Sequence, residues 1–148
     1  MLLPFWDGLV ATNPTDTECR MLADRHYSRR TVGARDFVGN GRKLVLRDTY
    51  GDVVFAWLWA ADEWRLEKQT GYNCTIFRNE SKRLSSDIIL EAEQAAFSYW
   101  GPNRVFTYVN GKKIRSTNPG YCFQKAGWIK SGLSKSGLVL LVKESNRE

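Results

Sequence analysis

The stretch FRNESKRLSSDII, residues 77–89, joins positive charge to hydroxyl groups where a predicted strand gives way to a predicted helix. The first backbone N–H groups of a helix have no partner within the helix and attract anions. Phosphate-binding turns of this kind are usually rich in glycine, which lets the backbone approach the phosphate closely. This stretch has no glycine, but it carries two arginines, a lysine and three serines. The pattern predicts an anion-binding elbow of unusual composition, with an ordinary serine-capped helix as the alternative.

A bound diphosphate would face the amides at the start of the helix, around Leu84 to Ser86. Hydroxyl groups that could donate to it are those of Ser81, Ser85 and Ser86. Arg78 or Arg83 could neutralise its charge. We therefore expect this elbow to be the anion site of the chain.

His26 is the only histidine, and it stands at the predicted end of a helix in the sequence HYSRR. Its side chain alone has an ordinary pKa near neutrality. It could act as a general base toward an amine, or bind a metal. Alternatively, it could be a cation stabilised by the helix C-terminus. Neighbouring arginines lower the pKa of an imidazole, which favours the base over the cation.

A net charge of +6 suits a polyanionic partner, because Lys and Arg displace counterions from phosphates. Tyr27, Tyr108 and Tyr121 could stack on a base that is flipped out of a duplex or single-stranded. The best candidates for phosphate contacts in DNA are Arg29, Arg30, Arg35, Lys112, Lys113 and Arg115. Each of these, taken singly, could also be ordinary surface.

Other functional classes find little support in the composition. Three cysteines, widely spaced and without a C-x-x-C pair, do not predict a structural zinc site. No apolar run approaches the roughly 20 residues of a membrane span, and the N-terminus does not resemble a secretory signal. We expect a cytoplasmic protein of one domain that does not enter a membrane.

Hydrophobic periodicity and turn residues predict a mixed α/β domain. We expect a helix over 14–27, a hairpin over 42–60 and a helix after the elbow whose Glu91 and Glu93 are exposed. Further strands are expected over 72–77, 104–110 and 137–143, the last paired with 128–131, and a short helix precedes that pair. The unit over 73–109 should be a right-handed parallel crossover in a mainly antiparallel sheet.

This order of elements, with the elbow after a strand and FQKAGW before the last strand pair, resembles the GNAT N-acyltransferase fold. In that family, R/Q-x-x-G-x-G/A at the elbow holds the pyrophosphate of acetyl-CoA. This motif can be aligned with the present elbow in two ways, and neither alignment places a glycine at a glycine position of the motif. The family's Y-x-x-x-G-F/Y element matches FQKAGW, so Phe123 stands where a tyrosine often protonates the departing thiolate. Tyr121 could take that role, and Asn118 is offset from the family's asparagine.

Three motifs, HYSRR, FRNESKRLSS and IRSTNPGYCFQKAGW, are similar to the Mom-type phage DNA-modification proteins. That resemblance implies modification of the exocyclic amine of adenine in DNA, with acetyl-CoA or a related acyl donor. It implies substrate-side chemistry by His26 and Tyr27, with Ser28 as a hydrogen-bonding residue, and adds Phe77, Asn118 and Phe123 to the donor site. Two alternatives stay open: an acetyl-CoA-dependent N-acetyltransferase acting on a small amine or a protein, and a nucleic-acid-binding module without enzymatic activity.

Overall fold

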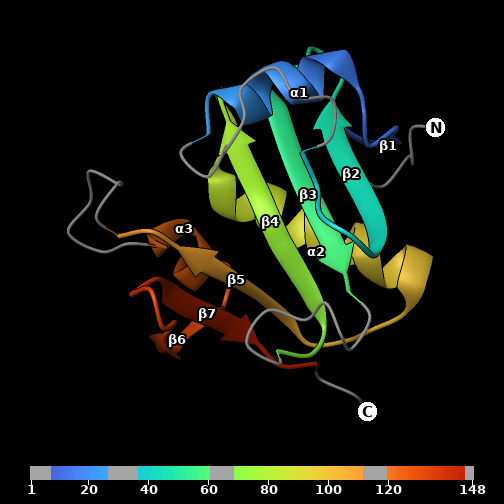
Figure 1. Cartoon of the computed structure of the whole chain (residues 1–148). Helices are drawn as coiled ribbons and strands as arrows, with labels where there is room; N and C mark the ends of the chain where they lie inside the picture. Colours follow the sequence, from blue (N-terminus) through green and yellow to red (C-terminus); the bar gives the residue numbers. More distant parts are fainter. Residues whose placement is uncertain (1–7, 27–36, 61–68, 112–119, 146–148) are drawn as a thin grey trace.

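A single mixed sheet organises the chain in the computed structural model, which describes residues 8–26, 37–60, 69–111 and 120–145 (Figure 1). In these residues seven strands follow the order β1-β2-β3-β4-β5-β7-β6, and every neighbouring pair is antiparallel except β4–β5. The strand–helix–strand unit β4–α2–β5 supplies that parallel pair. The predicted fold class, a mainly antiparallel α/β sheet with one parallel crossover, is confirmed.

The elements agree with most of the predicted ones. The strands are β1 (Leu9–Thr12), β2 (Arg42–Asp48), β3 (Val53–Trp59), β4 (Tyr72–Asn79), β5 (Val105–Val109), β6 (Ile129–Leu133) and β7 (Val139–Lys143). The helices are α1 (Thr17–Asp24), α2 (Ser85–Trp100) and α3 (Tyr121–Lys125). The short strand β1 at the sheet edge was not predicted.

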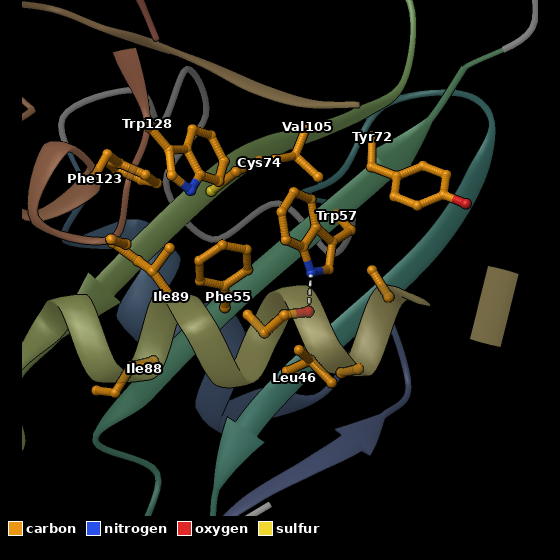
Figure 2. Close-up of a cluster of buried hydrophobic side chains, with 14 of the residues drawn as sticks. Leu46, Phe55, Trp57, Tyr72, Cys74, Ile88, Ile89, Val105, Phe123 and Trp128 are labelled. Carbon is orange, nitrogen blue, oxygen red and sulfur yellow. Dashed lines mark hydrogen bonds between the residues drawn. The ribbon is translucent and has the colours of Figure 1, made fainter. Parts of the chain in front are cut away.

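Helices α1 and α2 cover opposite faces of the sheet, because successive strand side chains point to opposite sides. On β3, Phe55 and Trp57 join the cluster under α2, whereas Val54 and Ala56 join the cluster under α1. Figure 2 shows the first cluster, where the indole Nε1 of Trp57 donates to the carbonyl oxygen of Ala92 at 2.9 Å. Burial of these apolar side chains fixes α2, and with it the elbow, against the sheet.

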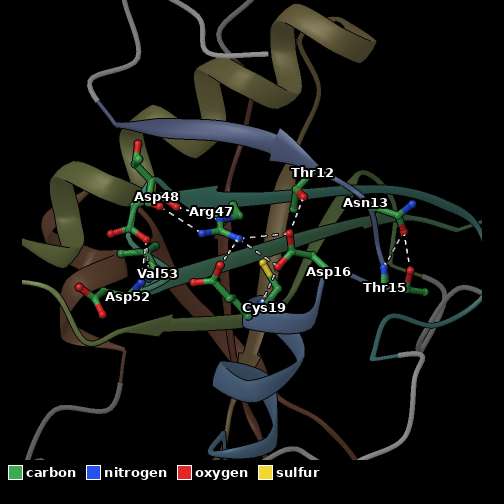
Figure 3. A network of polar contacts seen from close by, with 11 residues as sticks. Thr12, Asn13, Thr15, Asp16, Cys19, Arg47, Asp48, Asp52 and Val53 are labelled. Atoms are coloured by element: carbon green, nitrogen blue, oxygen red, sulfur yellow. Dashed lines mark hydrogen bonds and ion pairs between the residues drawn. The ribbon is translucent and has the colours of Figure 1, made fainter.

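Helix α1 is shorter than the predicted helix over 14–27, because it begins at a capping aspartate. The Asp16 carboxylate accepts the backbone N–H of Cys19 at 3.0 Å, which is the usual role of an N-cap (Figure 3). Thr12 Oγ1 donates to the same carboxylate at 2.8 Å, and Arg47 Nη1 at 3.2 Å. These bonds attach the start of α1 to β1 and β2.

Midway along strand β4, the alternation of side chains between the two faces of the sheet is shifted by one residue. Its register against β3 pairs Cys74 with Trp57 but Ile76 with Ala56, so one extra residue, Thr75, forms a bulge. Its parallel ladder with β5 covers only Tyr72–Cys74 of its eight residues. Beyond that point β4 and β5 diverge (Figure 1), and the second half of β4 leads to the elbow without pairing to β5.

The prediction that Glu91 and Glu93 are exposed on α2 was wrong. Glu93 is only 3% exposed: its carboxylate accepts Nε1–H of Trp128 and the Lys143 ammonium, both at 2.9 Å. Glu91 is mostly buried and pairs with Arg83. A helix that packs on a sheet and also meets the β6–β7 pair buries more than one stripe, and buried carboxylates are tolerated when paired.

Candidate functional site

The end of α1 is joined to the end of β4 by three charged side chains. Glu80 directly follows β4 and accepts from Nε of Arg25 at 2.8 Å and from its Nη2 at 2.9 Å. The same carboxylate accepts Nε of Arg78 at 2.5 Å. Arg78 also donates from Nη1 to the carbonyl oxygen of Arg25 at 2.9 Å. We call Arg25, Arg78 and Glu80 the arginine–glutamate bridge.

The bridge changes the ionisation of its own carboxyl group. Hydrogen bonds from Arg25, and then from Arg78, lower the pKa of Glu80 to about 2. The carboxylate is therefore charged throughout the neutral range. Glu80 is also held through its backbone, whose N–H donates to the carbonyl oxygen of Asp52 at 2.7 Å. The bridge thus ties three segments together: the end of α1, the β2–β3 turn and the end of β4.

His26 directly follows Arg25 in the chain and lies beside the bridge. Its backbone N–H donates to the carbonyl oxygen of Ala23 at 2.9 Å, which keeps it on the last turn of α1. Burial, with a smaller contribution from the charge of Arg78, lowers the pKa of His26 to about 4. The imidazole is neutral at pH 7 and can accept a proton. This low pKa favours the base over the histidine cation at the helix end, and the arginine that lowers it among the described residues, Arg78, comes from β4.

The elbow is organised by Asn79, the last residue of β4. Its Oδ1 accepts the backbone N–H of Ser81 at 2.9 Å and the Ser81 hydroxyl at 2.5 Å. Its Nδ2 donates to the carbonyl oxygen of Arg83 at 2.8 Å and to Oγ of Ser85 at 3.0 Å. An asparagine side chain readily closes such a turn on its own backbone. Side-chain hydrogen bonds therefore fix the shape of this elbow, whereas other anion-binding turns owe their shape to glycine residues.

The alternative interpretation of the elbow, a serine-capped α2, is not what the structure shows. Leu84 is the N-cap residue and makes no side-chain cap, while Ser85 Oγ accepts from Asn79 instead. Leucine is among the least favourable N-cap residues, and here 69% of it is exposed. The first-turn amides of α2 consequently receive no hydrogen bond from a capping side chain. The Ser86 hydroxyl forms no hydrogen bond within the described part of the chain.

Both elbow arginines have carboxylate partners. Arg78 belongs to the bridge, and Arg83 turns back along α2 to pair with Glu91. In this structure each arginine is thus paired with a carboxylate, although Arg78 shares Glu80 with Arg25. An incoming phosphate would have to compete with Glu80 or Glu91 for them.

The aromatic candidates for donor binding lie mainly in the core. Phe123 is buried, with its ring centroid 6.0 Å from that of Phe77 and 4.8 Å from that of Trp128. Tyr121, in contrast, is 55% exposed at the first position of α3. Of the two, Tyr121 is the accessible one.

Several predicted site residues lie outside the described residues: Tyr27, Ser28, Arg29, Arg30, Arg35, Lys112, Lys113, Arg115 and Asn118. Apart from Phe77, Tyr121 and Phe123, most of those that the structure describes fall into two groups. His26 and Arg78 come together at the end of α1, and Ser81 to Ser86 form the elbow that follows. Tyr108 lies on β5, the strand next to β4, where it pairs with Leu140 of β7.

Sequence reasoning missed the residues that hold this region together, Arg25, Asn79 and Glu80. A local signal existed for Asn79, because Asn-x-Ser after a strand is typical of an asparagine-closed turn. No local signal existed for Arg25 and Glu80, which are 55 residues apart and meet only through the packing of α1 on β4.

Comparison with known proteins identified no relative: no family model, curated protein or solved structure matches the chain. Within the described ranges, no three His, Cys, Asp or Glu side chains gather closely enough to hold a metal ion. No helix among those residues is sufficiently long and apolar to cross a membrane.

Proposed function

We propose that this chain transfers a small acyl-derived group from a thioester donor to the exocyclic amine of adenine in DNA. The observation that carries the proposal is the neutral, half-buried imidazole of His26 beside the elbow that opens α2. A base must be unprotonated at the working pH and must lie near the donor to take part in such a transfer. The low pKa of His26 supports the first requirement, and its place at the end of α1, beside Arg78 at the end of β4, supports the second.

Each residue group then has a defined part in the reaction. The amine nitrogen forms a bond to the donor carbonyl carbon, and the carbon–sulfur bond breaks. Nε2 or Nδ1 of His26 takes the proton that the amine loses. The exposed phenol of Tyr121 gives a proton to the leaving thiolate, so that a neutral thiol departs. Tyr27 and Ser28, which follow His26 in the sequence, are assigned to contacts with the adenine.

The arrangement of the sheet supports the resemblance to GNAT proteins that motivates the proposal. A parallel β4–α2–β5 crossover with an elbow at its first turn, followed by an antiparallel β6–β7 pair, is the order expected for that fold. The uncapped first turn of α2 suits a donor carrying a diphosphate, such as acetyl-CoA. The net charge of +6 suits a DNA acceptor.

A reconstituted reaction tests the chemistry directly. Purified protein is incubated with acetyl-CoA and either single-stranded DNA, which needs no base flipping, or a panel of small amines, and free thiol is measured. We expect thiol release that depends on adenine-containing DNA and falls at least about a hundredfold in His26→Gln. Thiol release with small amines alone would contradict the DNA acceptor and favour an ordinary N-acetyltransferase. DNA binding that survives in His26→Gln without any thiol release would favour a binding module.

A further inference from the structure

The arginine–glutamate bridge lies directly beside the proposed base, yet none of its three members can serve as that base. An arginine side chain has no atom that accepts a hydrogen bond, and the Glu80 carboxylate is occupied by both Arg25 and Arg78. The function of the bridge must therefore be sought in what it holds in place. Arg78 is the member whose charge acts on His26.

The geometry shows how the bridge places that charge. Without a partner, an arginine side chain at the end of a strand samples many rotamers and extends into water. Here the guanidinium of Arg78 is fixed from two sides, by Glu80 at Nε and by the Arg25 carbonyl oxygen at Nη1. The second contact is to the peptide unit that joins Arg25 to His26. The cation is thereby held against the chain segment that carries the imidazole.

We propose that Glu80 is a positioning residue for His26: its carboxylate fastens Arg78 to the end of α1 and keeps that cation beside the imidazole. The assignment rests on the proposed role of His26 as the base. It also assigns Arg78 a function other than neutralising a donor phosphate. The fixed cation disfavours a second positive charge on His26, so the imidazole stays unprotonated until it takes the proton of the amine.

Among the described residues, the charged groups near His26 come from two elements. The end of α1 supplies Asp24 and Arg25, and the end of β4 supplies Arg78 and Glu80. Strand β3, the other strand on which α1 packs, has no ionisable side chain from Val53 to Trp59. The negative charge of Glu80 by itself would raise the pKa of His26. Removing that charge should therefore lower this pKa if Glu80 acts directly, and raise it if Glu80 acts through Arg78.

Because His26 is the only histidine, its titration can be followed by NMR in the whole protein without ambiguity. We expect Glu80→Gln and Arg78→Gln each to raise the pKa of His26 by about half a unit to one unit, a roughly three- to tenfold gain in proton affinity. The double variant should show a pKa no higher than that of Arg78→Gln alone, because Glu80 lowers the pKa of His26 only through Arg78. Glu144→Gln removes the carboxylate of another exposed ion pair, with Arg104, and should leave the titration unchanged.

Three results would overturn the assignment: a lower His26 pKa in Glu80→Gln, no change in that variant, or additive shifts in the double variant. The activity profile gives a second readout, since the acid limb of DNA modification should move to higher pH in Glu80→Gln by the same amount. An unmoved acid limb in an active variant would also contradict it. The titration needs no substrate, so the expected shifts in a chain that leaves DNA unmodified would overturn the proposed function while supporting the role of Glu80.

Discussion

Replacement of Asn79 by alanine should loosen the elbow without unfolding the domain. The side chain makes four hydrogen bonds, to the backbone and hydroxyl of Ser81, the carbonyl of Arg83 and the hydroxyl of Ser85. A hydrogen bond contributes about 0.5–1.5 kcal/mol net, and half-exposed groups fall at the lower end because water replaces the lost partner. Four such bonds give about 2 kcal/mol as the expected decrease in the free energy of unfolding.

Urea denaturation measures this decrease, with the slope of the transition expected to stay constant. Asn73→Ala is the matched control: it lies on the same strand, is half-buried, and makes no side-chain hydrogen bond within the described residues. It should cost less than about 0.5 kcal/mol. Asn79→Asp keeps the acceptor for Ser81 but loses the donor, and should fall between the two. An Asn79→Ala variant as stable as Asn73→Ala would refute the role given to Asn79.

Three further predictions concern buried charge and helix capping. His26 has a pKa of about 4 in the folded protein against an ordinary value of 6.5, so only the unfolded chain takes up a proton between these pH values. The free energy of unfolding should therefore fall by up to about 3 kcal/mol as the pH drops from 6.5 to 4. Denaturation measured as a function of pH should show that His26→Gln removes this loss. Lys143→Met should lower the free energy of unfolding by about 3 kcal/mol, because it leaves the Glu93 carboxylate buried beside Trp128 without its cation. Adding Glu93→Gln to this variant should recover part of the loss in urea titrations, and the absence of any recovery would refute the role of the pair. Leu84→Ser should raise the unfolding free energy by about 1 kcal/mol by capping α2, and a lower melting temperature would contradict it.

Most of the fold was predictable, because hydrophobic periodicity and turn residues are local. The hairpin of β2 and β3, the long helix α2 and the pairing of β6 with β7 follow from such patterns. Strand β1 was missed because four residues at a sheet edge carry too short a pattern to identify. The burial of Glu93 was missed because it depends on Trp128 and Lys143, which lie 35 and 50 residues further along the chain.

The site was predictable in its parts but not in its assembly. Composition singled out His26 and the polar elbow, and the structure brings His26 next to Arg78, the first arginine of that elbow. The composition could not indicate that Arg78 pairs with Glu80 and Arg83 with Glu91, because each of these carboxylates has several possible partners nearby in the sequence. Long-range contacts decide which of those partners an arginine keeps.

The measurement that tests the central claim most directly is mass spectrometry of the nucleosides of plasmid DNA from cells that express this chain, beside a His26→Ala control. It needs no assumption about the donor and gives the added mass. We predict a heavier adenosine species that appears with the intact chain and is absent in the control. Unchanged nucleosides from cells that contain the soluble, folded protein would contradict the account.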